Sequence, residues 1–560
     1  MLSDLEIEAA YRKMIDRIDL VNDDYLKRVA EQIKKIGQLN PSSIHKLSQM
    51  RMYRGNIQQI RRKLAEALNI SAGELQQLLE RAAQEQYNDA NFSAVVQNKR
   101  RKPLRYSEEL KTYIAAVAQQ TAERFENYSN TTVIDQNYQE TVTNAIDAVT
   151  RGVTDYNSAI RDSMRKLGGD GLRVEYDSGV TRRMDTAIRQ NVIDGVKQIQ
   201  QEAARQAGEQ MGADGVELSA HPFSAVDHEP AQGRMYTNAE FEKMQSGQPF
   251  EDAEGKHYDG FERPIAEWNC RHFASPVIIG VSPRRYTDEQ LEAWKKKNHA
   301  GCDIGGKHYT VYEAGQLMRK IETRIRQQKD IANLAKRSGD NVLKREAQAK
   351  TVDLRAQYNV VAEAAGLKPR PERAIVESYT KEQTKEGERD AAQNYQNWSK
   401  EIGANASIET LANYYNVKYN DPPRYELLKQ YAGDVKSGWL SPLAGFDRYE
   451  ELYNRIQTEI VGKKTPNGIK ITGQAKHFMQ RVIGTMVDPD KLKNDMKIIR
   501  RSGVEYENVF NALFRPLRIG PIITRKDGKR SMRLYGERCS VSINPDTGQL
   551  IQTNKIGGDV

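Results

Sequence analysis

The sequence predicts a multidomain protein that is mostly α-helical, with a small loop-rich α+β module in the middle and an α+β domain at the C-terminus. Its 560 residues are too many for one compact core and suggest three or four units. Apolar residues recur at helical spacing over most of the chain. Two regions break this pattern: residues 204–286, rich in Gly, Pro, His and aromatics, and residues 461–560, which contain strand-like alternation.

Residues 1–203 are expected to form a helical docking region. A first helix is predicted by the stripe Met14, Ile18, Val21, Tyr25, Val29, Ile33 and Ile36, and a second by Ile57, Ile60, Leu64 and Leu68. Ser71 and Glu74 have capping-box spacing, which predicts that a third helix starts there. Because the region contains no phosphate loop or metal motif, a scaffold is favoured over a catalytic domain.

Helix is predicted to resume in residues 287–377. Thr287 and Gln290 have the spacing of a helix start, and a stripe follows through Ala314, Met318, Ile321 and Ile325. Residues 378–460 begin with a polar stretch that suits a linker or an exposed helix. They continue into a small helical unit rich in tyrosine, whose rings suit either protein contacts or core packing.

Charge separates the C-terminal domain from the rest of the chain. Residues 461–560 contain 19 Lys and Arg against 9 Asp and Glu, whereas residues 1–460 contain 66 against 67. The net charge of +9 therefore belongs to the last hundred residues, which points to a separate module with an anionic partner.

Composition also excludes several classes of protein. No apolar run approaches the roughly 20 residues that span a bilayer, so we expect no membrane-spanning segment. The first residues lack the basic and apolar parts of a secretory signal, so synthesis in a cytoplasm is expected. Three cysteines are too few for a disulfide framework and are expected to be free thiols or metal ligands.

The central module holds candidate metal ligands. Cys270 and His272 form a Cys-x-His pair, and His299 and Cys302 form a His-x-x-Cys pair about thirty residues later. These residue types bind zinc, although Cys-x-His is not a common zinc-finger spacing. A structural zinc, the only cofactor we consider, and hydrogen-bonded core histidines beside a buried thiol both remain open. A hydrolytic site is not favoured, since no His-Glu-x-x-His motif is present.

A series of motifs in and after this module is shared with a known family. They are Ser219-Ala220-His221, His228, Gln232-Gly233-Arg234-Met235-Tyr236, Trp268-Asn269-Cys270-Arg271-His272, Gly280-Val281-Ser282 and Tyr286-Thr287-Asp288-Glu289. Over roughly residues 1–370 the chain resembles the phage minor capsid protein type 2 family, the minor head proteins. The resemblance implies a virion protein made in the bacterial host, present in few copies inside the head at the portal vertex. Its partners would be the portal protein, other head proteins and packaged DNA, and its role head assembly, DNA packaging or delivery.

The basic C-terminal domain carries the groups that a metal-independent ribonuclease needs: an acid or base, and donors for the phosphorane charge. His477 and Arg481 are expected to share a helix face. There His477 would act as general acid or base and Arg481 would hold a phosphate. Ser542 or Thr553 would supply an orienting hydroxyl. The predicted nucleic-acid contacts are Lys476, Lys529, Arg530 and Arg533.

Residues 465–556 also resemble the phage-borne and polymorphic-toxin ribonuclease domains of the barnase, EndoU, colicin and RelE class. The motifs that carry this resemblance are Gln474-Ala475-Lys476-His477-Phe478, Lys529-Arg530-Ser531 and Asn544-Pro545-Asp546-Thr547-Gly548. It implies host RNA as a target after delivery with the DNA. Two alternatives stay open: a C-terminal domain that binds nucleic acid without cutting it, and a secreted interbacterial toxin with a helical leader.

Overall fold

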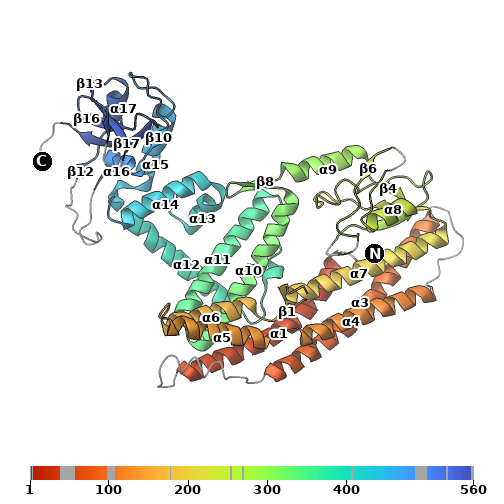
Figure 1. The fold of residues 1–560 in the computed structure, drawn as a ribbon. Helices are drawn as coiled ribbons and strands as arrows, with labels where there is room; N and C mark the ends of the chain where they lie inside the picture. Colours follow the sequence, from red (N-terminus) through yellow and green to blue (C-terminus); the bar gives the residue numbers. More distant parts are fainter. Residues whose placement is uncertain are drawn as a thin grey trace. The chain divides into compact units, whose positions relative to one another are not determined.

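A computed structural model describes residues 2, 4–37, 57–96, 107–132, 134–176, 178–251, 255–265, 267, 270–404, 408–485, 501–524 and 528–556 (Figure 1). The chain separates into two compact units. Unit 1 contains residues 1–303 and 307–388, and unit 2 contains residues 304–306 and 389–560. The mostly helical class is confirmed, and among the described residues no helix has the length and apolarity to cross a membrane.

Unit 1 is built mainly of long helices that share one apolar core (Figure 1). They are α1 (Asp4–Gly37), α3 (Ile57–Val96), α4 (Glu108–Asn130), α5 (Ile134–Thr150), α6 (Tyr156–Asp170), α7 (Met184–Met211), α10 (Val311–Ser338) and α11 (Asn341–Ala364). Helices α1, α3 and α7 pack on one another, and α10 packs on α1, α6 and α11. The predicted stripes are confirmed, since Met14, Ile18, Leu64 and Leu68 are all buried.

The helix start predicted at Ser71 is wrong, because α3 runs through this position without a break. The Ser71 hydroxyl donates back to the carbonyl of Ala67 at 2.8 Å, as serines inside helices do. Ser71 and Glu74 instead receive the guanidinium of Arg17 on α1. Arg17 donates to Ser71 Oγ at 2.9 Å and to both Glu74 oxygens at 2.8 and 3.1 Å. Ser71 and Glu74, which have capping-box spacing, therefore form a contact between α3 and α1.

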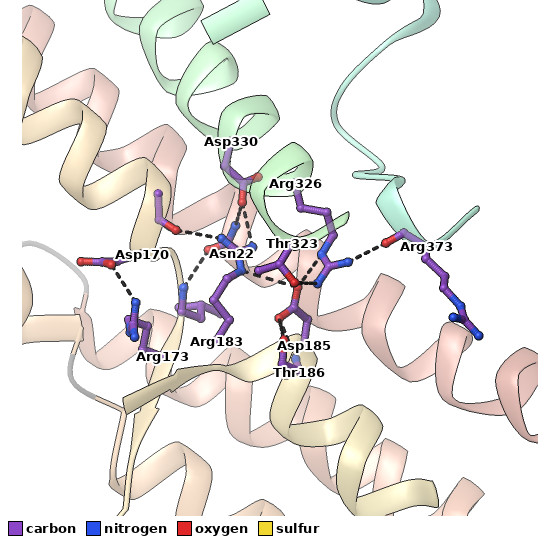
Figure 2. A network of polar contacts seen from close by, with 12 residues as sticks. Asn22, Asp170, Arg173, Arg183, Asp185, Thr186, Thr323, Arg326, Asp330 and Arg373 are labelled. Atoms are coloured by element: carbon purple, nitrogen blue, oxygen red, sulfur yellow. Dashed lines mark hydrogen bonds and ion pairs between the residues drawn. The ribbon is translucent and has the colours of Figure 1, made fainter. Parts of the chain in front are cut away.

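A buried network of charges ties distant segments of unit 1 together (Figure 2). Arg183, at the end of the short strand β2 (Thr181–Arg183), donates to Asp330 of α10 at 2.9 Å. Asp330 also accepts from Asn22 of α1 at 3.3 Å, and Arg326 of α10 donates to Asp185 of α7 at 2.9 Å. Burial acts to raise the pKa of Asp185, but the guanidiniums of Arg326 and Arg183 hold it well below its ordinary value.

The central module of unit 1 contains a three-stranded antiparallel sheet in the order β4 (Met235–Thr237), β3 (Gly215–Leu218), β7 (Ala274–Val277). Helix α8 (Asn238–Gln245) and the strands β5 (Phe250–Glu251) and β6 (His257–Tyr258) complete its own apolar core. Strand β7 lies against α7, where a Cβ added to Gly208 would lie 2.5 Å from Pro276 Cβ. The module is therefore seated directly on a long helix.

Helix α9 (Asp288–Ala300) follows the module, and the side chain of Thr287 accepts from the Gln290 amide as predicted. Strands β8 (Cys302–Ile304) and β9 (Lys307–Tyr309) pair next, and a single turn of 3-10 helix, η1 (Pro371–Ala374), comes after α11. The polar stretch after residue 378 forms helix α12 (Lys381–Ile402), which buries Tyr395 and Ile402. Of the two forms expected there, the chain adopts the helix.

Unit 2 combines helices with a mixed sheet. Its helices are α13 (Leu411–Asn420), α14 (Pro422–Lys436), α15 (Phe446–Arg455), the π-helical turn η4 (Ile456–Ile460), α16 (Lys476–Ile483) and α17 (Tyr506–Phe514). The sheet has the order β10 (Gly473–Gln474), β17 (Gln549–Lys555), β16 (Cys539–Ile543), β15 (Arg530–Tyr535), β13 (Arg518–Ile519), with β14 (Ile523–Thr524) also on β15. The strand-like alternation expected in residues 461–560 corresponds to the antiparallel pair β16–β17, and the helix expected to carry His477 and Arg481 is α16.

One apolar core runs through unit 2, whereas the sequence predicted a division at 460/461. Tyr431 and Tyr449 belong to the same buried cluster as Phe478 and Val541. Lys476, the first residue of α16, also forms an ion pair at 3.0 Å with the buried Asp434 of α14. The tyrosine-rich helices and the sheet therefore bury apolar surface against each other, which a change in composition along the chain does not reveal.

Candidate metal centre and basic domain

Three buried ligand-type side chains converge in the central module. They are His228, from the loop between β3 and β4, and Cys270 and His272, which precede β7. One ligand atom from each lies within 4.8 Å of the others. The exposed fractions of the three residues are 2%, 4% and 2%, so bulk water does not separate them. Trp268 and Asn269 of the same sequence motif lie outside the described residues.

Hydrogen bonds on the outer side of each imidazole set its orientation. His228 Nε2 lies 2.7 Å from the carbonyl oxygen of Arg263. His272 Nε2 lies 3.2 Å from Gln232 Oε1, which also accepts from the backbone amide of His221 at 3.1 Å. The His221 ring stacks on the His272 ring with centroids 4.4 Å apart. Both histidines thus turn Nδ1 toward the centre of the cluster, where Cys270 Sγ lies.

The other two predicted ligands are not in this cluster. His299, in the last turn of α9, pairs with Glu229 at 2.7 Å, and Cys302 begins strand β8 half-buried. The structure therefore brings together Cys270 and His272 but adds His228 in place of His299 and Cys302. The sequence analysis did not select His228 as a ligand, because it precedes Cys270 by 42 positions and short ligand spacings are the usual signal.

A cavity of about 580 Å³ opens beside the cluster and is lined by residues of the module and of α1, α7 and α10. All three cluster residues and His221 reach its wall. Most charged residues of the lining are basic: Arg12, Arg189, Arg263, Arg271, Arg319, Lys320, Arg326, Lys368, Arg370 and Arg373, against Glu8, Asp185 and Glu322. Burial lowers the pKa of Arg189, and Glu8 neutralises part of the charge by pairing with Arg370 and Arg373. The cavity is thus a cationic environment.

The candidate residues of the basic domain lie in unit 2. His477 is exposed on α16 with Nδ1 2.9 Å from Gln480 Oε1, and Arg481 follows one turn later. Lys476 pairs with Asp434 and Arg530 pairs with Asp546 at 2.6 Å, which partly neutralises these two predicted nucleic-acid contacts. Lys529 and Arg533 are exposed.

The sheet register separates the two hydroxyls proposed for this site. Val541 lies opposite Thr553, and Ser542 lies opposite Gln552, on antiparallel strands. Cross-strand partners share a face and successive residues alternate, so Ser542 and Thr553 lie on opposite faces of the sheet. Thr553 shares the face of the core residue Val541 and donates to the carbonyl of Ser540 at 3.0 Å. Ser542 shares its face with Arg533, its partner on β15.

Comparison with known protein families gives a match that covers most of unit 1. The family model described as phage minor capsid protein 2 matches residues 2–361. No curated protein and no solved structure matches the chain. The matched residues include the central module with His228, Cys270 and His272, and they end before residues 389–560, the main part of unit 2.

Proposed function

This chain belongs to the phage minor capsid protein 2 family, and on that premise we propose that it is bound in few copies at the portal vertex, inside the phage head. There it acts in head assembly and in the packaging and delivery of DNA. The observation that carries this proposal is the family match over residues 2–361, which covers most of unit 1.

The construction of unit 1 supports a mechanical role of this kind. Its helices share one core, and the pairs Arg183–Asp330 and Arg326–Asp185 link segments that are more than 140 positions apart. Buried ion pairs of this sort favour one arrangement of the helices over others, since an unpaired buried charge is costly. A unit with a single stable arrangement suits a part that must dock in a large assembly.

The portal hypothesis is tested by co-expressing the full chain with the portal protein and, separately, with the major shell protein. We expect stable co-purification with the portal and none with the shell. Purified heads should contain the chain in a copy number set by the portal ring. Equal binding to the shell, or a copy number in the range of the shell protein, would reject the portal position. Killing of neighbouring bacteria that an adjacent immunity gene relieves would favour the toxin alternative.

A second proposal concerns the C-terminal hundred residues, which we infer to contact packaged DNA. It is supported by their 19 basic against 9 acidic residues and by the polar sheet face that pairs Arg533 with Ser542. Phosphate contacts by lysine and arginine release counterions, so binding should weaken steeply with salt. Cleavage of host RNA by His477 and Arg481 is the catalytic alternative.

Both forms of the second proposal are tested with the full chain. Binding to duplex DNA is measured at several salt concentrations for the wild type and Arg533→Ala, with the salt-bridged Arg165→Ala of unit 1 as the matched control. Arg533→Ala should lower the salt slope by about one, and the control should not. RNA cleavage lost in His477→Ala and Arg481→Ala would establish the nuclease, and binding unaffected by Arg533→Ala would reject the proposed face.

A further inference from the structure

The distances within the central cluster are those of a metal coordination shell. His228 Nδ1 and His272 Nδ1 are 3.3 Å apart, and Cys270 Sγ lies 3.5 Å from the former and 3.7 Å from the latter. A zinc ion binds imidazole nitrogen at about 2.0–2.1 Å and thiolate sulfur at about 2.3 Å in tetrahedral geometry. The edges of such a tetrahedron measure about 3.3 Å between two nitrogens and about 3.6 Å between nitrogen and sulfur. The three atoms therefore form one face of a zinc-sized tetrahedron.

The hydrogen bonds around the cluster place the ring proton of each histidine on Nε2. Too few protons therefore remain for hydrogen bonds among the three ligand atoms. A carbonyl oxygen can only accept, so the contact with Arg263 places the proton of His228 on Nε2. Gln232 Oε1 already accepts from the His221 amide, which identifies it as the oxygen and makes His272 Nε2 a donor as well. Both Nδ1 atoms then present lone pairs to each other. The one thiol proton of Cys270 can satisfy only one of them, whereas a cation between them satisfies all three atoms.

We propose that His228, Cys270 and His272 bind a zinc ion through Nδ1, Sγ and Nδ1, with a water molecule in the fourth position. The softness of the donors favours zinc over the oxygen-preferring magnesium and calcium. Arg263 and Gln232 act as the outer partners that hold the two rings, a common arrangement around histidine ligands. Since all three ligands line the cationic cavity, the fourth position faces that space.

The three ligands come from separate segments of the chain, so the module must fold before it can bind the metal. The loop after β3 supplies His228, and the segment before β7 supplies Cys270 and His272. Both β3 and β7 pair in the same sheet, which brings the two segments together. The ion thus joins the two ends of a module whose core contains short strands and loops, and zinc commonly stabilises such small units.

The first test measures metal in the intact protein. We expect one zinc per purified full-length chain, or the same stoichiometry after reconstitution of chelated protein with zinc alone. With cobalt in place of zinc, the protein should show the thiolate-to-cobalt charge-transfer band in the near ultraviolet together with the visible bands of a tetrahedral site. Cys270→Ser should remove the charge-transfer band, and His272→Ala should weaken cobalt binding at least tenfold.

Matched controls use the ligand-type residues outside the cluster. Cys302→Ser and His299→Ala should leave the stoichiometry and the spectrum unchanged. The chain with both Cys302→Ser and Cys539→Ser keeps Cys270 as its sole cysteine, so it should retain the charge-transfer band even if Cys270→Ser fails to fold. Gln232→Leu keeps all three ligands and should lower zinc affinity by about 10- to 100-fold.

Several outcomes would overturn the site. A wild-type chain that binds no zinc at stoichiometric concentration would reject it, because the cluster would then be a hydrogen-bonded core. A charge-transfer band that disappears in the chain lacking Cys302 and Cys539, or that persists in Cys270→Ser, would assign the thiolate to another cysteine. Zinc affinity unchanged in Gln232→Leu would reject its assigned role as an outer partner.

Discussion

Arg183 Nη2 lies 2.9 Å from Asp330 Oδ2, although 147 positions separate the two residues, and both side chains are buried (Figure 2). Asp185 lies 3.5 Å from the same guanidinium, and burial raises the pKa of Asp330 against the pull of Arg183. One arginine therefore compensates two buried carboxylates at the junction of α1, α7 and α10.

Removal of this guanidinium should destabilise unit 1 strongly. Arg183→Met leaves Asp330 without its ion-pair partner, whereas Asp185 keeps Arg326, and breaking a buried pair in this way costs about 3–5 kcal/mol. Urea unfolding followed by circular dichroism measures the loss. Arg151→Met is the control, because its pair with Asp147 is exposed and worth at most about 1 kcal/mol. Equal losses in the two variants would contradict the role assigned to the network.

Because the central module packs on α7, we predict that two glycine-to-alanine substitutions in helices change the free energy of unfolding in opposite directions. Gly208→Ala places a Cβ 2.5 Å from Pro276 of β7, and overpacking of this kind costs about 1–3 kcal/mol. Gly73→Ala meets nothing within 4 Å in α3, so it should gain about 0.5–1 kcal/mol from helix propensity. Thermal unfolding of both variants checks the signs. A stabilising Gly208→Ala would show that β7 can move away from the helix.

The contact between α1 and α3 predicts an energetic coupling between Arg17 and Glu74. Both side chains are partly exposed, so the coupling should be modest, about 0.5–1 kcal/mol. A double-mutant cycle of Arg17→Ala and Glu74→Ala in urea unfolding measures it. Arg62 and Glu66, a more exposed pair at 3.9 Å within α3, provide the control cycle, with a coupling nearer zero. No coupling for Arg17 would contradict the contact between the helices.

The raised pKa of Asp434 predicts that the free energy of unfolding of unit 2 depends on pH. Burial raises its pKa, and Lys476, Gln480 and His477 only partly oppose this. The folded state therefore holds the proton more tightly than the unfolded state does. The stability that this contributes is present at low pH and is lost as pH rises from the ordinary Asp value of about 4 through the raised pKa.

Asp434→Asn removes this titration while keeping the shape of the side chain. The difference in unfolding free energy, variant minus wild type, should become more positive as pH rises from about 4 and then level off. Urea unfolding of the full chain at a series of pH values measures the difference. Asp546→Asn, at an exposed pair with Arg530, is the control for replacing an aspartate that forms an ion pair. A difference that becomes more negative with pH would mean that the ion pair with Lys476 outweighs the cost of burial.

Most helices and the C-terminal hairpin could be predicted from the sequence because they depend on short-range patterns. The stripe from Met14 to Ile33 forms one buried face of α1, and alternation from Cys539 to Ile543 forms β16. The cap at Thr287 was equally visible, since its side chain reaches an amide three residues later. The family, too, was identified from motifs in the order in which they occur, and the family match confirms it.

Only the tertiary structure decided which distant side chains meet. The spacing of Ser71 and Glu74 predicted a helix cap. Both side chains instead accept hydrogen bonds from Arg17, because α3 packs against α1. Short spacings pointed to His299 and Cys302 as ligands, whereas the sheet brought His228 to Cys270. The local pattern determines how a segment folds because its hydrogen bonds join near neighbours. The meeting of residues tens or hundreds of positions apart depends on how whole segments pack, and a single sequence does not display that packing.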